Sequence, residues 1–245
     1  MVLGLLGLAF MLPLLDGTIV CVAMPSIQSD LGFRGGGIHW VMTAYLLSFG
    51  GFLPLGIRLC DLLGSRRMFL VGIAVFTAGS LVSGVAWSSG VLVAGRALQG
   101  IGAAVLAPTT LPLLVAHFDV ASGRGRALAL WSLIGASAGT AGYLVGGPLV
   151  AGPGWQWIFL VNVPVGAGML ALGPVLLHHG ENLARRCRHP LVPLRLLASR
   201  TRLCGILVLL AGGVAAEGSP FLLTLYMQQV LGSSPATFGV LMTIM

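Results

Sequence analysis

Three charged residues lie within long apolar runs of the sequence: Asp16, Arg96 and Glu217. A charge inside a membrane span costs about 2.5–3.5 kcal/mol on insertion scales, so each needs a partner or a function there. A carboxyl group in a low-dielectric surrounding takes up a proton more readily than in water, and an arginine beside it can hold it ionised. The three side chains therefore predict proton coupling. A static buried ion pair and the wall of a water-facing cavity are the alternatives.

The apolar runs around these residues are long enough to span a membrane. The chain has 245 residues, of which 57% are hydrophobic and 8% charged, with a mean hydropathy of +1.00. A soluble domain carries about 25% charged residues. Residues 68–95, 127–180 and 218–245 contain no Asp, Glu, Lys or Arg, and about 20 apolar residues cross a bilayer. We therefore predict an all-α integral membrane protein with the lipid bilayer as its surrounding partner.

Turn residues and arginine-rich breaks separate about seven to eight predicted spans. The spans are 3–24, 40–60, 69–88, 91–116, 127–150, 156–177 and 203–224, with an eighth starting near Thr237. With the N-terminus in the cytoplasm, eleven of the 13 arginines lie inside and only Arg34 lies outside. This distribution follows the positive-inside rule. It predicts a multi-pass protein of the cytoplasmic membrane.

Several other function classes are not favoured. The pI near 10.3 comes from arginines in short loops, with no aromatic-studded basic face, so nucleic acid is not an expected partner. No nucleophile–base pair is evident in the spans, and the G-x-S-x-G at 135–139 lies in an apolar helical run, so an enzyme is not predicted. No metal or other cofactor is predicted either, because the four cysteines form no CxxC pair. They are Cys21, Cys60, Cys187 and Cys204.

A weak internal repeat links the two ends of the chain. The pattern Q-x-x-L-G occurs at 28–32 and again at 228–232. The embedded acids Asp16 and Glu217 precede the two glutamines by 12 and 11 residues. Parallel repeats of this kind build many secondary transporters, so the repeat favours a transporter.

Residues 15–25, LDGTIVCVAMP, resemble the first-helix signature L-D-x-T-I-V-N-V-A-L-P of the fourteen-span drug/proton antiporters of the major facilitator superfamily. Residues 92–104, LVAGRALQGIGAA, match that family's pattern l-x-x-x-R-x-x-q-G-x-g-a-a. Residues 155–166 resemble the entry to its sixth span. The resemblance implies that Asp16 is the embedded acid and that Arg96 couples the proton. It also implies proton-coupled efflux of small amphipathic or cationic drug-like or antibiotic compounds.

A third segment, residues 56–67, resembles the cytoplasmic loop motif of the superfamily. Its glycines permit a tight turn, and Asp61 with Arg66 or Arg67 can form a charge cluster that latches helix ends. The positive-inside rule by itself also explains arginines at this place. The candidate gating residues are Gly56, Arg58, Asp61, Gly64, Arg66 and Arg67.

A fourth segment, residues 138–147, resembles the antiporter motif g-x-x-x-G-P-x-x-G-G, with Ala138 for its first glycine and Tyr143 for its proline. Spacings of four, three and four place four glycines on one helical face, where a neighbouring helix can pack closely. The candidate helix-packing residues are Gly135, Gly139, Gly142, Gly146 and Gly147.

The resemblance divides the chain into an N-terminal six-helix bundle (1–178), a cytoplasmic Arg-rich loop (179–202) and a partial C-terminal half (203–245). The family inserts two spans between its halves, and the segment 190–197 is of the kind that precedes its ninth span. We therefore expect those two spans to be absent. Because a midplane transport site forms between two halves, the alternative function is a truncated, non-transporting membrane fragment.

Overall fold

The computed structural model describes residues 1–33, 37–118, 123–177, 223, 226–227 and 237. The helices of these residues are α1 (Val2–Asp30), α2 (His39–Leu63), α3 (Ser65–Gly84), α4 (Ser89–His117), α5 (Arg124–Ala151), α6 (Trp157–Leu160) and α7 (Asn162–Leu176). In the described part of the chain there is no strand, and six segments are long and apolar enough to cross a membrane. The all-α membrane fold is therefore confirmed for the first six spans. Glu217, the loop 179–202 and the predicted seventh and eighth spans lie outside the described residues, apart from isolated positions.

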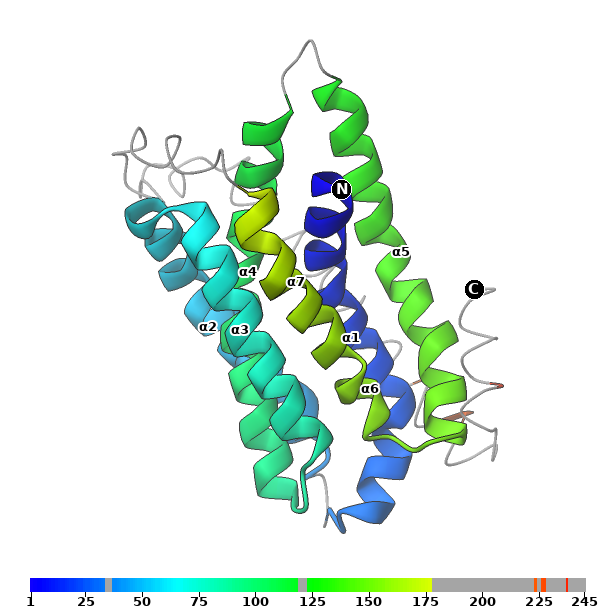
Figure 1. Ribbon diagram of the computed structural model, residues 1–245. Coiled ribbons are helices and arrows are strands. Elements are labelled where there is room, and N and C mark those ends of the chain that lie inside the picture. Colours follow the sequence, from blue (N-terminus) through cyan, green and yellow to red (C-terminus); the bar gives the residue numbers. More distant parts are fainter. Residues whose placement is uncertain (34–36, 119–122, 178–222, 224–225, 228–236, 238–245) are drawn as a thin grey trace, which may run out of the picture.

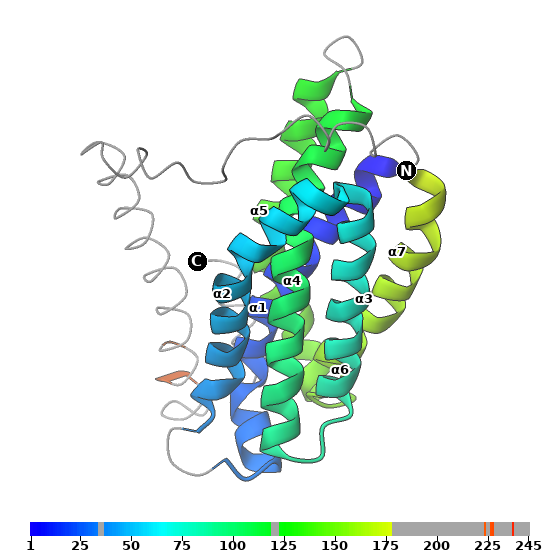
Figure 2. The same cartoon turned by 90° about the vertical axis from the view of Figure 1, so that its left-hand side faces the viewer.

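The helices run side by side along the long axis of the bundle (Figures 1 and 2). The closest pairings are α4 with α3, α4 with α2, and α1 with α5. One end of the bundle, here called the Gly32 end, holds the C-termini of α1 and α3 and the N-termini of α2 and α4. The opposite Gly64 end holds the N-terminus of the chain and the turn between α2 and α3. Residues near the start of α4 therefore lie near the ends of α1 and α3.

Two breaks between helices are shorter than the hydropathy pattern predicts. Between α2 and α3 only Gly64 is non-helical, with φ +90°, a backbone conformation that favours glycine. The sequence predicts a longer break between these two spans, at 61–68, because hydropathy indicates where the apolar run stops and not where the helix stops. Similarly, α1 continues through Pro25 to Asp30, six residues beyond the predicted end.

The sixth span, in contrast, is interrupted. Val161 separates α6 from α7, although the sequence predicted one span over 156–177. Pro164 provides the reason, since it has no N–H to donate to the carbonyl of Leu160, one turn earlier. Asn162 is the first residue of α7 and thus stands directly at this break.

Glycines set the close helix contacts of the bundle. A Cβ at Gly102 would overlap the backbone of Phe76 in α3, and one at Gly56 would overlap the carbonyl of Ala104 in α4. Gly56 is therefore a packing residue inside α2 and not part of a turn. Such small residues let membrane helices approach closely, and the approach brings the polar side chains of α3 and α4 together.

The glycine face of α5 contacts α1. A Cβ at Gly142 would overlap the Thr18 side chain, one at Gly146 would lie 3.0 Å from Ile19 Cγ1, and one at Gly135 would overlap the ring of Phe10. Gly139 has more room, with its nearest neighbour 4.0 Å away, and Gly147 is buried. The neighbour that the spacing of these glycines anticipated is thus α1, the helix that carries Asp16.

Candidate functional site

Asp16 and Arg96 form an ion pair in the interior of the bundle. Both side chains are 0% exposed, and Arg96 Nη1 donates a hydrogen bond to Asp16 Oδ2. Asp16 lies at the middle of α1, whereas Arg96 lies two turns into α4, counted from the Gly32 end. The pair that sequence reasoning left open is therefore formed, across 80 residues of chain.

The second oxygen of the carboxylate has two donors of its own. Gln99 Nε2 lies 3.1 Å from Asp16 Oδ1, and Asn162 Nδ2 lies 3.2 Å from the same atom. With Arg96 on Oδ2, Asp16 accepts hydrogen bonds from α4 and α7 at the same time. A change in the charge of Asp16 would therefore disturb bonds to two helices.

The guanidinium of Arg96 is held on several sides. Its Nε donates to the carbonyl of Val41 in α2 over 3.0 Å, and its Cζ lies 4.3 Å from the ring centroid of Tyr45 and 5.7 Å from that of Phe159. Contacts of this kind with aromatic faces stabilise a cation. Tyr45 in turn donates its hydroxyl to the carbonyl of Pro13 in α1, over 3.1 Å. Among the described residues, Arg96 Nη2 has no hydrogen-bond partner.

Gln99 connects the ion pair to α3. Its Oε1 accepts from Arg96 Nη1 at 3.0 Å and from Ser83 Oγ at 3.2 Å, while its Nε2 also donates to Ser80 Oγ at 2.8 Å. The Ser80 hydroxyl in turn donates to the carbonyl of Phe76. Because Gln99 lies one turn after Arg96 on α4, both side chains occupy one helix face. The buried network thus joins α1, α2, α3, α4 and α7.

Sequence reasoning singled out Asp16 and Arg96 but not their partners. Gln99 and Asn162 lie within the recognised segments 92–104 and 155–166, and a buried polar residue in a membrane span is itself a signal of function. Ser80, Ser83 and Tyr45 carry no such signal, because Ser is common at membrane helix interfaces and Tyr is common near membrane surfaces.

The candidate gating residues gather at the Gly64 end, well away from the buried network. Arg66 Nη2 donates to the carbonyl of Pro174 in α7 over 2.8 Å. The last carbonyls of a helix lack partners within the helix, so Arg66 caps α7. The charge cluster of Asp61 with Arg66 or Arg67 stays a prediction. The turn at Gly64 is a single residue, and beyond it the Arg66 side chain extends to α7. Arg58 and Arg67 are exposed.

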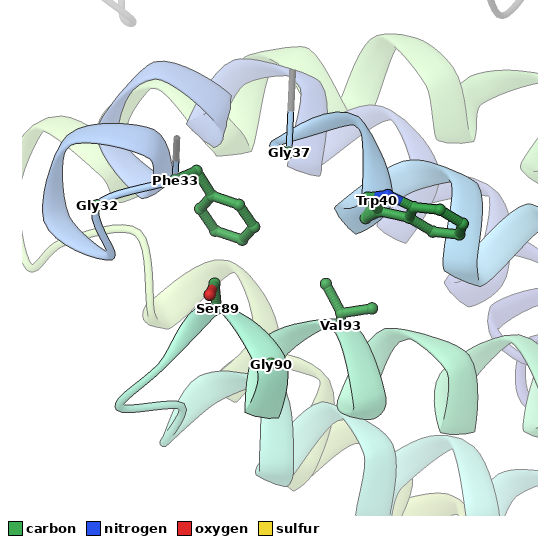
Figure 3. A pocket seen from close by; sticks show the side chains of 7 residues that line it. All are labelled: Gly32, Phe33, Gly37, Trp40, Ser89, Gly90 and Val93. Carbon is green, nitrogen blue, oxygen red and sulfur yellow. The ribbon is translucent and has the colours of Figure 1, made fainter. Parts of the chain in front are cut away.

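A pocket opens at the Gly32 end, at the start of α2 and α4 (Figure 3). Its volume is about 530 Å³. The rings of Phe33 and Trp40 and the side chains of Ser89 and Val93 line it, together with Gly32, Gly37 and Gly90. None of the network residues lines it, so the pocket and the ion pair are separate features. No group of metal-ligating side chains occurs in the described part of the chain.

Six membrane-length segments around a buried acid–arginine network define a membrane transporter fold. A profile described as the Major Facilitator Superfamily matches residues 6–245. The chain belongs to the major facilitator superfamily, whose members are transporters and not enzymes.

Named relatives of this chain include antibiotic export and resistance proteins. The cephamycin export protein CmcT of Amycolatopsis lactamdurans is 43% identical over 164 residues, which cover 67% of this chain and 34% of the relative. The puromycin resistance protein pur8 of Streptomyces alboniger is 33% identical over 285 aligned positions, which cover 95% of this chain and 57% of the relative. The transporter EfpA of Mycobacterium tuberculosis is 42% identical over 162 residues, 66% of this chain and 30% of the relative.

A solved structure has the same fold. It is that of a bacterial homologue of the human lysosomal transporter Spinster, in an inward-facing and unoccupied conformation. The TM-score is 0.69 at 20% identity, and the match covers 98% of this chain and 57% of that protein. The chain thus spans between about a third and somewhat more than half of the length of the relatives described here.

Proposed function

We propose that this chain carries the proton-coupling half of an exporter that exchanges entering protons for small amphipathic or cationic drug-like compounds. The exporter lies in the cytoplasmic membrane, with the N-terminus of the chain and the Gly64 end facing the cytoplasm. Asp16 is the proton carrier, and Arg96 is the cation that holds it ionised between transfers. The observation that carries the proposal is the fully buried Asp16–Arg96 pair with its amide donors.

The network supplies a physical reason for coupling. When a proton binds Asp16, the carboxylate becomes a neutral carboxyl group and Arg96 loses its buried counter-charge. Leaving one buried charge unpaired costs about 3–5 kcal/mol. That energy favours a rearrangement of α4 relative to α1, since these helices carry the two members of the pair. Release of the proton on the other side of the membrane restores the ion pair. Each protonation and deprotonation of Asp16 therefore moves one proton across the membrane.

The substrate class rests on the relatives. Their printed names refer to cephamycin export, puromycin resistance and methylenomycin A resistance. The gating role of Asp61 and the arginines around Gly64, and the antiport role of the α5 glycines, belong to the same proposal. They are supported by the placement of Arg66 on α7 and of the glycine face on α1.

The alignment with the puromycin resistance protein has 285 positions, more than the 245 residues present here, which supports the expected absence of inserted segments.

The chain spans only part of its relatives, so the transport activity of a whole protein is tested on two forms. One form is the 245-residue chain, and the other is the product of its reading frame extended as far as it continues. Both are reconstituted into proteoliposomes with a trapped pH-sensitive dye, and puromycin is the probe.

The decisive variant is Asp16→Asn, with Asp30→Asn as its matched control. Asp30 is an acid on the same helix, but it is exposed and its Oδ2 accepts from Trp155 Nε1 over 2.8 Å. We expect puromycin-driven proton release in the wild type and in Asp30→Asn, and none in Asp16→Asn. Undiminished release with Asp16→Asn contradicts the proposal. If the extended form moves protons and the 245-residue chain does not, the chain by itself is a non-transporting fragment.

A further inference from the structure

Asn162 has a distinct position among the donors to Asp16. Arg96 and Gln99 both come from α4, whereas Asn162 comes from α7, 146 residues along the chain from Asp16. Its side chain is 1% exposed, so no bulk water competes for its amide. It therefore provides the hydrogen bond that ties the carboxylate to the sixth span.

The other two donors are fixed by further bonds. Arg96 is held by Val41, and Gln99 is held by Ser80 and Ser83. Rotation of the Gln99 amide would break its bonds to Arg96 and to both serines. Within the described residues, by contrast, the Asn162 side chain makes one hydrogen bond, the bond to Asp16 Oδ1.

Because the Asn162 amide has this one bond, it can rotate when Asp16 takes up a proton. A carboxylate accepts only, whereas a protonated carboxyl group must also donate one hydrogen bond. Arg96 cannot accept, and the Gln99 oxygen is already occupied by two donors. A half-turn of the Asn162 amide replaces its NH₂ group by its carbonyl oxygen, which can accept the new O–H. Asn162 is thus the partner that can bond to both states of Asp16.

The backbone around Asn162 suits this role. It is the first residue of α7, directly after the break at Val161 that Pro164 imposes. Gly166, one turn further, lies so close to Thr77 that a Cβ there would overlap the threonine side chain, which holds α7 against α3. The position of the amide is therefore determined by helix packing and not by a flexible loop.

We propose that Asn162 is a positioning residue that sets the pH at which Asp16 exchanges its proton. The inference rests on the proposed function in taking Asp16 as the proton carrier. In the described part of the chain, the charged or titratable groups of the network are Asp16 on α1, Tyr45 on α2 and Arg96 on α4, while its members on α3, α6 and α7 are uncharged.

The test is a titration of the carboxyl C=O stretching band by infrared difference spectroscopy on the reconstituted chain. Asp16→Asn identifies the band of Asp16, because that band disappears in this variant. The test variant is Asn162→Leu, which has a similar size but no donor, and Asn162→Ala replaces it if the leucine variant fails to insert. The matched control is Thr109→Val, since Thr109 is equally buried but its hydroxyl donates to the carbonyl of Leu106 and not to a member of the network.

Asn162 can bond to both states of Asp16, but a hydrogen bond to a charged carboxylate is stronger than one to a neutral carboxyl group, so loss of Asn162 favours protonation. We expect the Asp16 band in Asn162→Leu to titrate about one pH unit higher than in the wild type. The midpoint in Thr109→Val should stay close to that of the wild type. An unchanged midpoint in Asn162→Leu, or an equal shift in Thr109→Val, overturns the proposal, because a purely structural asparagine would give either result.

A second readout separates this inference from the proposed function. The pH profile of puromycin-driven proton release should move in the same direction as the infrared midpoint. If the wild type releases no protons, the proposed function fails, yet the infrared titration still decides the role of Asn162. If transport is intact and the infrared midpoint does not respond to Asn162, only the present inference fails.

Discussion

Replacement of Asp16 by Asn removes the negative member of an ion pair that has no contact with solvent. The new amide cannot satisfy all of its neighbours. If its oxygen stays toward Gln99 and Asn162, its NH₂ group faces Arg96 Nη1, a donor against a donor. If the new amide turns by half a turn, the NH₂ groups of Gln99 and Asn162 face its own NH₂ group instead.

The magnitude follows from the burial of Arg96. Loss of one member of a buried pair costs about 3–5 kcal/mol, because the remaining charge is desolvated and unpaired. Arg96→Met leaves Asp16 in the same condition, so we expect a similar loss. In the double variant both charges are absent and an apolar side chain fills the arginine site. The double variant should therefore cost no more than either single variant, which is at least about 3–5 kcal/mol less than their sum.

The assay is a double-mutant cycle on the unfolding free energy, measured in lipid bicelles by reversible denaturation that is followed by tryptophan fluorescence. Asp30→Asn serves as the control for removal of a charge from α1. Single and double losses that add within about 0.5 kcal/mol would refute the reasoning, since independent sites behave in that way. The pair would then contribute nothing beyond its separate members.

Two further predictions concern the packing of the bundle and the surroundings of Arg96. Gly102→Ala should lower the unfolding free energy by about 1–3 kcal/mol, because its Cβ would overlap the backbone of Phe76 in α3. Gly50→Ala, in α2 with nothing within 4 Å of the new Cβ, is the matched control and should leave that free energy unchanged or raise it slightly. Equal effects in both variants would show that the α3–α4 contact is not tight. Tyr45→Phe should cost about 0.5–1.5 kcal/mol through loss of the hydrogen bond to Pro13. The ring over Arg96 remains in this variant, so the pH profile of proton release should not move, and a displaced profile would assign the hydroxyl a part in proton transfer.

The location of the spans could be read from the sequence because hydropathy is a local and additive property. Five of the first six predicted spans correspond to single helices, and the differences lie at their ends. The sixth span was harder to predict. Pro164 is visible in the sequence, but proline is tolerated within α1, α2, α4, α5 and α7. Whether a proline breaks a membrane helix depends on the neighbours that can satisfy the freed carbonyl.

Asp16 and Arg96 could be identified without a structure, because a charge in an apolar run is costly wherever the helix lies. Their pairing could not be derived in the same way. The amides of Gln99 and Asn162 and the hydroxyl of Ser80 meet the carboxylate or its partners only when α1, α3, α4 and α7 are assembled. Arg66 is a similar case, since its bond to the carbonyl of Pro174 in α7 lies 108 residues away in sequence and follows from the packing of α3 with α7.

The sequence by itself determined that this protein spans a membrane, that Asp16 and Arg96 lie within its spans, and which face of α5 is lined by glycine. Each of these depends on residue type and on helical periodicity, which are fixed before any two helices meet. The tertiary structure decided which helix covers the glycine face and which donors surround Asp16. It also decided that Arg66 caps α7. Those outcomes depend on close approach between helices, down to the van der Waals contact of Gly102 with α3, and short-range contact is not encoded at any single position.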